Sequence, residues 1–295
     1  MKTRMRIIMS CIVAICMACC LTACNPKEKI DEFLTPTSVE EAMAAKRAEA
    51  NQLLSTPSIV EDGYLTVGLR TAETTAPFCI VQASGEVMGM DIDLASMLAD
   101  ALGLKVRFVN VTSVEASLGT ECDIVMNVAI GDAGNATVVG AYAENATALF
   151  TMGDATIADA SELAEHTVGL QSGSVSQRLL AMSDLRMYET SYDNLNGAFE
   201  ALAAGEVEYV CCDLYSGAYL ASFYDNVSMV GTIDVPTAEG IAVAADNTAI
   251  QVQIQSALDT IQSNGQGDLV RINWIGGMPN ATSSSQISGI SQSVE

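Results

Sequence analysis

The sequence predicts an α/β fold with two cores, each a mixed or parallel sheet flanked by helices. Short apolar, β-branched segments alternate with longer segments whose apolar residues recur at helical spacing, and this alternation occurs twice along the chain. These segments occupy residues 58–277, a length that suffices for one large or two modest cores. Alternating strands and helices are typical of parallel sheets, which bind ligands beyond the carboxyl ends of their strands.

The first unit is expected to hold strands at residues 64–69, 106–109 and 123–128, because each is a short apolar run rich in β-branched residues. A helix is expected at residues 91–102, where apolar side chains share one helical face and Gly103 follows as a C-cap. We interpret these elements as a β-α-β-α-β unit, which places its second helix between the last two strands.

The second unit repeats this alternation with strands at residues 167–170 and 207–212 and helices at 176–182, 194–204 and 215–223. The segment after it does not continue the unit. Its parts are a short strand at residues 240–244, a helix at 249–261 and an apolar piece at 269–274.

The N-terminus has the order of a secretory signal, with three basic residues among the first six and an apolar run at residues 7–23. An apolar run of about 20 residues can also span a bilayer as an uncleaved anchor, so the run alone leaves two alternatives. Leu21-Thr22-Ala23-Cys24 resembles the lipobox of bacterial lipoproteins, in which the cysteine thiol receives lipid. The resemblance implies a signal peptide at residues 1–23 and a lipid such as palmitate on Cys24.

Four cysteines then remain in the exported chain, and they allow three disulfide pairings. They are Cys79, Cys122, Cys211 and Cys212. Cys211 and Cys212 are adjacent within an apolar run, which favours burial as small hydrophobic side chains. The cysteines lack metal-ligand spacing, and His166 is the only histidine, so we expect neither a metal site nor a cofactor.

The composition is strongly acidic, with 13 basic and 36 acidic residues in the full chain. A nucleic-acid partner is excluded, because it requires clustered Lys and Arg. Residues 24–57 are expected to form a charged tether in which 38–54 can be a polar helix, with Ser38 and Glu41 as a capping box. Residues 278–295 have little to bury and are expected to be a disordered tail.

Ten stretches occur in the order that is known from one protein family. They are Gly63–Gly68; Ala76–Phe78; Gly85 through Gly89-Met-Asp91-Ile-Asp93; Leu102–Val106; Cys122–Val125; Val168 through Gly173-Ser174; Ala201 through Gly205-Glu-Val-Glu; Asp213; Gly240–Val243; and Asn273-Trp274-Ile-Gly. Over residues 60–277 the chain thereby resembles the bacterial extracellular solute-binding proteins that serve amino-acid ABC importers.

The resemblance implies a periplasmic-binding-protein-like fold of type II. Lobe one would comprise residues 58–148 plus 239–277 and lobe two residues 149–238, with two chain segments as a hinge. The protein would be a monomer that closes around a small-molecule solute and presents it to an ABC permease. It would be held by its lipid at the extracellular face of the cell membrane, or in the periplasm if the envelope has an outer membrane.

The resemblance also implies where the ligand binds. Asp213 would pair with the α-ammonium group of the solute, although an aspartate that only caps the next helix is the alternative. Gly173, Ser174 and Val175 precede a helix, and their N–H groups and the hydroxyl would hold a carboxylate.

Other positions depart from the family pattern. Asn135 stands where the family has the arginine that binds the α-carboxylate, and Val128 and Ile130 replace small hydroxyl residues, so Asn127 is the one polar residue left there. The usual carboxylate site is therefore missing, and the ligand's identity is not predicted.

Arg70 follows the first strand, and we hypothesise that it binds an anionic group of the solute. The alternative is a surface pair with Glu73. Phe78 is expected to line the pocket or to pack in the core. No residue is predicted to be catalytic, but a dehydratase-like enzyme and a surface sensor or adhesion module on the same fold stay as alternative functions.

Overall fold

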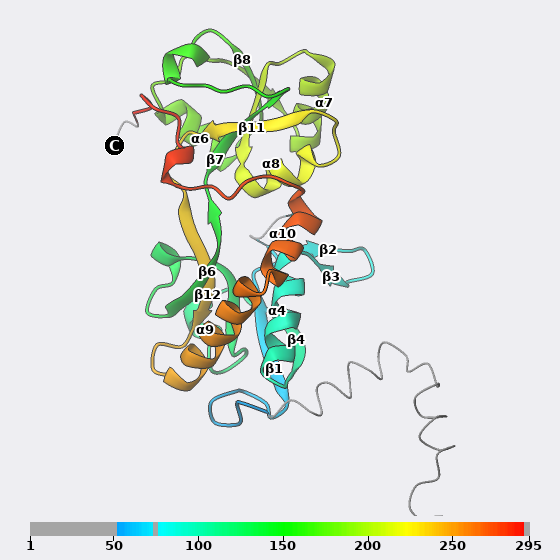
Figure 1. Cartoon of the computed structure of the whole chain (residues 1–295), viewed down its shortest axis with the longest axis vertical. Helices are drawn as coiled ribbons and strands as arrows, with labels where there is room; N and C mark the ends of the chain where they lie inside the picture. The colour runs from blue at the N-terminus through cyan, green and yellow to red at the C-terminus, as the bar shows by residue number, and fades with distance from the viewer. Residues whose placement is uncertain (1–51, 73–75, 292–295) are drawn as a thin grey trace, which may run out of the picture. The chain divides into compact units, whose positions relative to one another are not determined.

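The structure is a computed structural model, and it describes residues 52–72 and 76–291. The predicted signal peptide, Cys24, nearly all of the tether and Glu73 lie outside the described residues. Two five-stranded sheets and one two-stranded sheet make up the strands of the described part. Figure 1 shows helices beside both five-stranded sheets. The predicted mixed α/β fold with two cores is confirmed.

The first five-stranded sheet has the order β4-β1-β5-β12-β6. Its strands are β1 (Tyr64–Leu69), β4 (Lys105–Asn110), β5 (Ile124–Ala129), β6 (Thr137–Asn145) and β12 (Thr237–Val243). β1 runs parallel to β4 and β5, whereas β12 runs antiparallel to β5 and β6. Two helices pack on this sheet, α4 (Met90–Ala101) and α9 (Thr248–Ser263), and a third, α10 (Gln266–Ile275), packs against both of them. A hairpin and two short helical turns complete this half: β2 (Ile80–Val81), β3 (Val87–Met88), α5 (Val114–Ser117) and η1 (Ile130–Asp132).

The second five-stranded sheet has the order β11-β7-β10-β8-β9. Its strands are β7 (Thr147–Met152), β8 (Thr167–Gln171), β9 (Tyr188–Tyr192), β10 (Tyr209–Asp213) and β11 (Val227–Thr232). β8 runs parallel to β9 and β10, and β7 runs antiparallel to β10 and β11. The helices of this half are η2 (Ala160–Leu163), α6 (Val175–Met182), α7 (Leu195–Ala204) and α8 (Leu214–Ala221), and η3 (Ser283–Ser285) follows near the C-terminus.

The chain crosses between the two sheets twice, and the crossings lie side by side. Only Ala146 separates β6 from β7, and residues 233–236 connect β11 to β12. The backbone N–H of Thr147 donates to the Asp234 carboxylate at 2.7 Å, and the N–H of Ile233 donates to the Thr147 carbonyl at 2.8 Å. The two segments therefore form the two-stranded connection that the family resemblance implies.

A close approach of two backbones positions the start of α4. Gly89 has a φ of 142°, and a Cβ at this position would lie 2.1 Å from the Phe78 carbonyl oxygen. Only glycine fits here. The N–H groups of Met90 and Asp91 donate to the carbonyls of Pro77 and Phe78, so the loop before α4 is held against the beginning of the helix.

Cys211 and Cys212 point to opposite faces of β10 because side chains alternate along a strand. Cys211 is fully buried in one apolar cluster of the second half, and Cys212 is buried in another. Their predicted burial as small hydrophobic residues is confirmed. Burial also raises the pKa of the Cys79 thiol to about 11 and that of the Cys122 thiol to about 12.

The strands and helices predicted within residues 64–261 are all present, with ends that differ by a few residues. The apolar piece at 269–274 forms most of α10. β6, β7, β9 and β11 were not predicted. β9 has the sequence YETSY and is almost fully exposed at the edge of its sheet, so apolar alternation could not reveal it.

The expectation of a disordered tail is wrong for residues 278–291. Ala281 and Ile287 are buried, and the Ile287 N–H donates to the carbonyl of Thr232 on the edge strand β11 at 3.0 Å. The Ser291 hydroxyl donates to Asp184 at 2.6 Å. In Figure 1 the segment after α10 runs along the second half of the molecule. The composition of this segment did not predict its ordered structure, because two buried apolar side chains and pairing with an edge strand are enough to hold it in place.

In the described part of the chain, no helix is long and apolar enough to cross a membrane.

Candidate solute-binding site

Asp213 ends β10 and caps the helix that follows it. Its Oδ1 accepts a hydrogen bond from the backbone N–H of Ser216 at 2.8 Å, so the capping role that the sequence left as an alternative is present. Its Oδ2 accepts a second hydrogen bond from Asn145 Nδ2 at 2.7 Å. Because a carboxylate has about four acceptor positions, these two bonds leave capacity for a ligand.

Asn145 connects Asp213 to the hinge. It is the last residue of β6, and its Nδ2 also faces Glu239 Oε1 on β12 at 3.4 Å. Its Oδ1 accepts from the N–H of Ala146 at 3.0 Å, which fixes the orientation of the amide. One side chain in the crossing segment thus contacts a carboxylate of each sheet.

Glu239 is a half-buried carboxylate on the second crossing segment. Burial raises its pKa to about 7, and the nearby negative charge of Asp213 acts in the same direction. The hydrogen bond from Asn145 and the positive charge of Arg70 lower its pKa, but by less. Its Oε2 is buried and has no hydrogen-bond partner among the described residues. Glu239 is therefore poised to change its protonation state near neutral pH.

A second buried carboxylate lies on the first turn of α4. Asp91 is 1% exposed, and it accepts a hydrogen bond from the Tyr142 hydroxyl at 2.6 Å. Burial raises the pKa of Asp91 to about 8, the Tyr142 hydrogen bond opposes this, and the charge of Glu239 adds to it. The pKa of Tyr142 is also raised, chiefly by burial.

Arg70 supplies the positive charge in this region. Its Nη2 donates to the backbone carbonyl of Asn127 at 2.6 Å, and its charge lowers the pKa of both Asp91 and Glu239. Asn127 itself is buried and adopts a φ of 55°, in the left-handed region that asparagine tolerates better than most residues. Asn127 thus orients Arg70 through its backbone.

These side chains form what we call the hinge polar cluster. Its members are Arg70, Asp91, Asn127, Tyr142, Asn145, Asp213 and Glu239. The cluster joins the carboxyl ends of β1, β5 and β10 to both crossing segments, which is where a two-lobed binding protein holds its ligand. It presents carboxylates from both halves and a guanidinium from one, so it can bind ammonium and anionic groups.

The remaining predicted site residues lie elsewhere or have other partners. Phe78 is 3% exposed and packs on Tyr215 of α8 with ring centroids 4.7 Å apart, so it belongs to the apolar core rather than to an open pocket. Asn135 is exposed and donates from Nδ2 to Glu115 at 2.7 Å. The structure therefore gives Asn135 a partner outside the hinge polar cluster.

The glycine-serine turn before α6 forms a helix cap. The Ser174 hydroxyl accepts from the N–H of Gln177 at 3.1 Å, and the N–H of Gly173 donates to Oε1 of the same glutamine at 2.8 Å. Val175 is 60% exposed. A carboxylate that binds at this turn would compete with Gln177 for the N–H of Gly173.

Sequence reasoning missed Asn145, Glu239 and Tyr142, and it quoted Asp91 only as part of a motif. Glu239 offered one signal, because it directly precedes the apolar residues 240–243 of the same strand, and glutamate is seldom buried. Asn145 gave no signal, since its strand was not predicted at all.

Two helix-flanked sheets that are joined by two adjacent crossings, with a polar cluster at the joint, define a two-lobed binding protein. The chain matches the sequence model of the bacterial extracellular solute-binding proteins, family 3, over residues 65–277, and it belongs to that family.

Curated relatives share low identity with the chain over most of their length. The chain is 23% identical over 222 residues to ABC transporter arginine-binding protein 1 of Escherichia coli K12, and this alignment covers 70% of the chain and 90% of the relative. The chain is 23% identical over 212 residues to the arginine-binding periplasmic protein of Mannheimia haemolytica, and this alignment covers 68% of the chain and 87% of the relative.

Solved structures show the same fold. A substrate-binding protein of a polar amino acid ABC uptake transporter from Streptococcus thermophilus has a TM-score of 0.65 at 18% identity, covering 75% of this chain and 89% of that one. The L-cystine solute receptor of Neisseria gonorrhoeae, in its unliganded open conformation, has a TM-score of 0.62 at 16% identity, with coverages of 75% and 95%.

Proposed function

We propose that the chain is the substrate-binding lipoprotein of an ABC importer, and that it captures an amino acid or a related small polar or anionic solute between two lobes. We assign residues 58–148 plus 239–277 to lobe one and residues 149–238 to lobe two, bounds that differ by two residues from the starts of β7 at Thr147 and β12 at Thr237. Membership of the solute-binding family supports the class, and the relatives' names support an amino acid as the solute.

The N-terminal segment supports the lipoprotein part of the proposal. Lipid on Cys24 holds the mature protein at the outer face of the cell membrane, or in the periplasm, where it meets the permease. The tether at residues 24–57 then gives the binding domain reach.

The observation that carries the proposal is the hydrogen bond from Asn145 on the hinge to Asp213 at the end of β10. A solute ammonium that binds Asp213 sits where the two halves of the chain join. Its contacts to both lobes are gained only on closure, so the solute shifts the population toward the closed form. The permease then recognises that closed form.

The solute groups can be assigned to residues. Asp213 binds the ammonium group, and Arg70 binds the anionic group in place of the family's missing arginine. Arg70 is held toward the cluster by the Asn127 carbonyl, which supports this assignment. A guanidinium binds a carboxylate with two parallel hydrogen bonds, so it can replace the missing residue.

Catalysis is not part of the proposal. His166 lies before β8, at the end of that strand remote from Gln171, and pairs with the exposed Glu208 at 2.9 Å. A dehydratase would require a titratable pair at the solute for general acid–base chemistry. Asp91 and Glu239 are the carboxyl groups of the cluster with raised pKa, so their substitution would test any turnover.

A thermal-shift screen with amino acids, short peptides and organic acids tests the function. A ligand at 100 times its dissociation constant adds about 2.7 kcal/mol to the free energy of unfolding, which is readily detected. We expect at least one amino acid or organic acid to raise Tm. No response from the whole panel would contradict the proposal and favour the sensor or adhesion module.

Variants then test the site. Asp213→Asn should weaken binding by roughly 10- to 100-fold, because a charged hydrogen bond contributes about 1.5–3 kcal/mol. Arg70→Ala should weaken binding by a similar factor. Asp225→Asn removes an exposed carboxylate elsewhere and serves as the control. Unchanged affinity in the Asp213 or the Arg70 variant, measured by calorimetry, would remove that residue from the site.

A further inference from the structure

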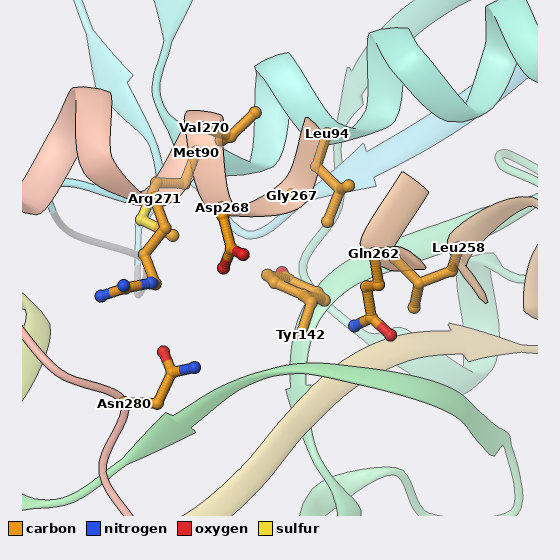
Figure 2. A pocket seen from close by; sticks show the side chains of 10 residues that line it. All are labelled: Met90, Leu94, Tyr142, Leu258, Gln262, Gly267, Asp268, Val270, Arg271 and Asn280. Carbon is orange, nitrogen blue, oxygen red and sulfur yellow. The ribbon is translucent and has the colours of Figure 1, made fainter. Parts of the chain in front are cut away.

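A cavity of about 230 Å³ lies on the side of the molecule where α4, α9 and α10 meet (Figure 2). The ring of Tyr142 on β6 and Asn280 of the C-terminal segment complete its walls. None of the residues assigned to solute binding above, Asp213 or Arg70, lines it. Drug-sized ligands occupy cavities of roughly 300–1,000 Å³, so this cavity suits a smaller molecule.

The cavity has an apolar floor and a polar rim. Leu94, Leu258 and Met90 supply aliphatic surface, and they are 5% exposed or less. Gln262, Asp268 and Asn280 are exposed at the rim. A ligand that matches this division has a small apolar part and polar groups at one end.

The rim carries one charge of each sign. Asp268 and Arg271 are three residues apart on α10, a spacing that places two side chains on the same helical face. Figure 2 shows the two side chains next to each other, with Asp268 directed toward Tyr142 and the guanidinium of Arg271 extending on the other side of Asp268, above Asn280. The two groups are therefore presented together to whatever enters the cavity.

Neither charge is neutralised by a neighbour. Within residues 52–72 and 76–291 neither Asp268 nor Arg271 forms an ion pair, with the other or with any other side chain. Arg271 donates from Nη1 to the carbonyl of Met278, which is a neutral acceptor. Two opposite charges of this kind beside an apolar floor match a molecule that carries both an ammonium and a carboxylate group.

We propose that this cavity is a second solute site, which binds a small zwitterion with an aliphatic side chain, that is, an aliphatic α-amino acid. Arg271 receives the carboxylate, Asp268 receives the ammonium group, and the amides of Gln262 and Asn280 supply further hydrogen bonds. The side chain packs against Leu94 and Leu258. A dianion is disfavoured because Asp268 repels it, and a dication is disfavoured by Arg271.

The second site shares Tyr142 with the hinge polar cluster but contains neither Asp213 nor Arg70. Tyr142 takes part in both, but its hydroxyl is committed to Asp91 while its ring lines the cavity. The two sites can therefore be inactivated one at a time, and the second proposal stands or fails independently of the first.

L-leucine is the probe, and binding is measured by calorimetry and by the fluorescence of Trp274. Trp274 is the only tryptophan of the chain, and it lies on α10 with its indole N–H donated to Asp93 at 2.7 Å. We expect saturable binding of L-leucine to the full protein and to Asp213→Asn alike. The single-charge analogues 4-methylpentanoate and 3-methylbutylamine should bind at least tenfold more weakly.

Two variants should abolish this binding without harming the fold. Asp268→Asn removes the proposed ammonium partner, and Asp225→Asn is the matched control that loses a charge elsewhere. Gly267→Leu fills the cavity from its wall, where a Cβ would approach no atom closer than 3.8 Å. Leucine also favours a helix more than glycine does, so this variant should fold at least as well as the wild type.

The outcomes are distinct. Loss of L-leucine binding in Asp268→Asn and Gly267→Leu, with retention in Asp213→Asn and Asp225→Asn, supports the second site. The proposal is overturned if L-leucine does not bind the wild type at millimolar concentration, if both cavity variants bind it unchanged, or if Asp213→Asn alone removes the binding.

Discussion

Glu239 on the second crossing segment is the residue whose substitution tests the electrostatics of the hinge polar cluster. Its pKa is raised from 4.5 to about 7, mainly by burial. A carboxyl with a raised pKa in the folded state binds a proton more tightly there than in the unfolded chain. Its contribution to stability is fully present below pH 4.5, and it is lost as the pH rises through about 7.

The magnitude follows from this shift. Each pKa unit corresponds to 1.36 kcal/mol, so the wild type should lose about 3 kcal/mol of unfolding free energy between about pH 4 and pH 8 because of this group. Glu239→Gln cannot ionise, and its side-chain oxygen can still accept from Asn145. The variant should equal the wild type at about pH 4 and be more stable than it at about pH 8.

Urea unfolding at the two pH values, followed by circular dichroism and Trp274 fluorescence, measures the difference. Coincident transitions by the two probes justify a single unfolding free energy. Glu200→Gln, which removes an exposed carboxylate on α7, is the control for loss of one negative charge. An equal loss of stability with pH in the wild type and Glu239→Gln would refute the reasoning, because it would mean that the pKa of Glu239 is the same in the folded and unfolded states.

Two further substitutions test the packing. Ile287→Ala removes a buried side chain of the C-terminal segment and should lower the unfolding free energy by roughly 2–5 kcal/mol in urea titrations; a change below about 0.5 kcal/mol would mean that the segment is not packed as described. Gly217→Ala places a Cβ 2.2 Å from Phe150 and 2.6 Å from the Cys212 sulfur, so it should lower the free energy of unfolding by about 1–3 kcal/mol. Gly277→Ala, whose Cβ would meet no atom within 4 Å, should be near neutral. Equal melting temperatures for the two variants would contradict the close contact on α8.

Asp213 shows how far the sequence reached toward the site. The strand before it is a short run of buried apolar residues, and open α/β sheets bind ligands beyond the carboxyl ends of their strands, so a charged residue at that end is a candidate ligand contact. The structure has Asp213 at the end of β10, beside the hinge. Arg70 could be found in the same way, because it directly follows β1.

Asn145 and Glu239 show what the sequence could not reveal. They are 94 residues apart, and they meet only because β12 pairs antiparallel with β6 in one particular register, in which Ala143 faces Glu239 and Asn145 faces Thr237. Register depends on which strands become neighbours, and a one-residue slip would turn each side chain to the other face. No local pattern records that choice.

The sequence by itself determined most of the helices, the strands β1, β4, β5, β8, β10 and β12, and the residues at the ends of the central strands, because apolar periodicity and chain punctuation are local properties. The ordered motifs along the chain indicated the family. The tertiary structure alone decided the burial of Asp91 and Glu239, the order of the C-terminal segment and the cavity beside α10. Each of these depends on how far neighbouring segments exclude water from a side chain. The free energy of desolvation of a carboxylate or an apolar side chain is therefore fixed only when segments distant in the sequence have packed together.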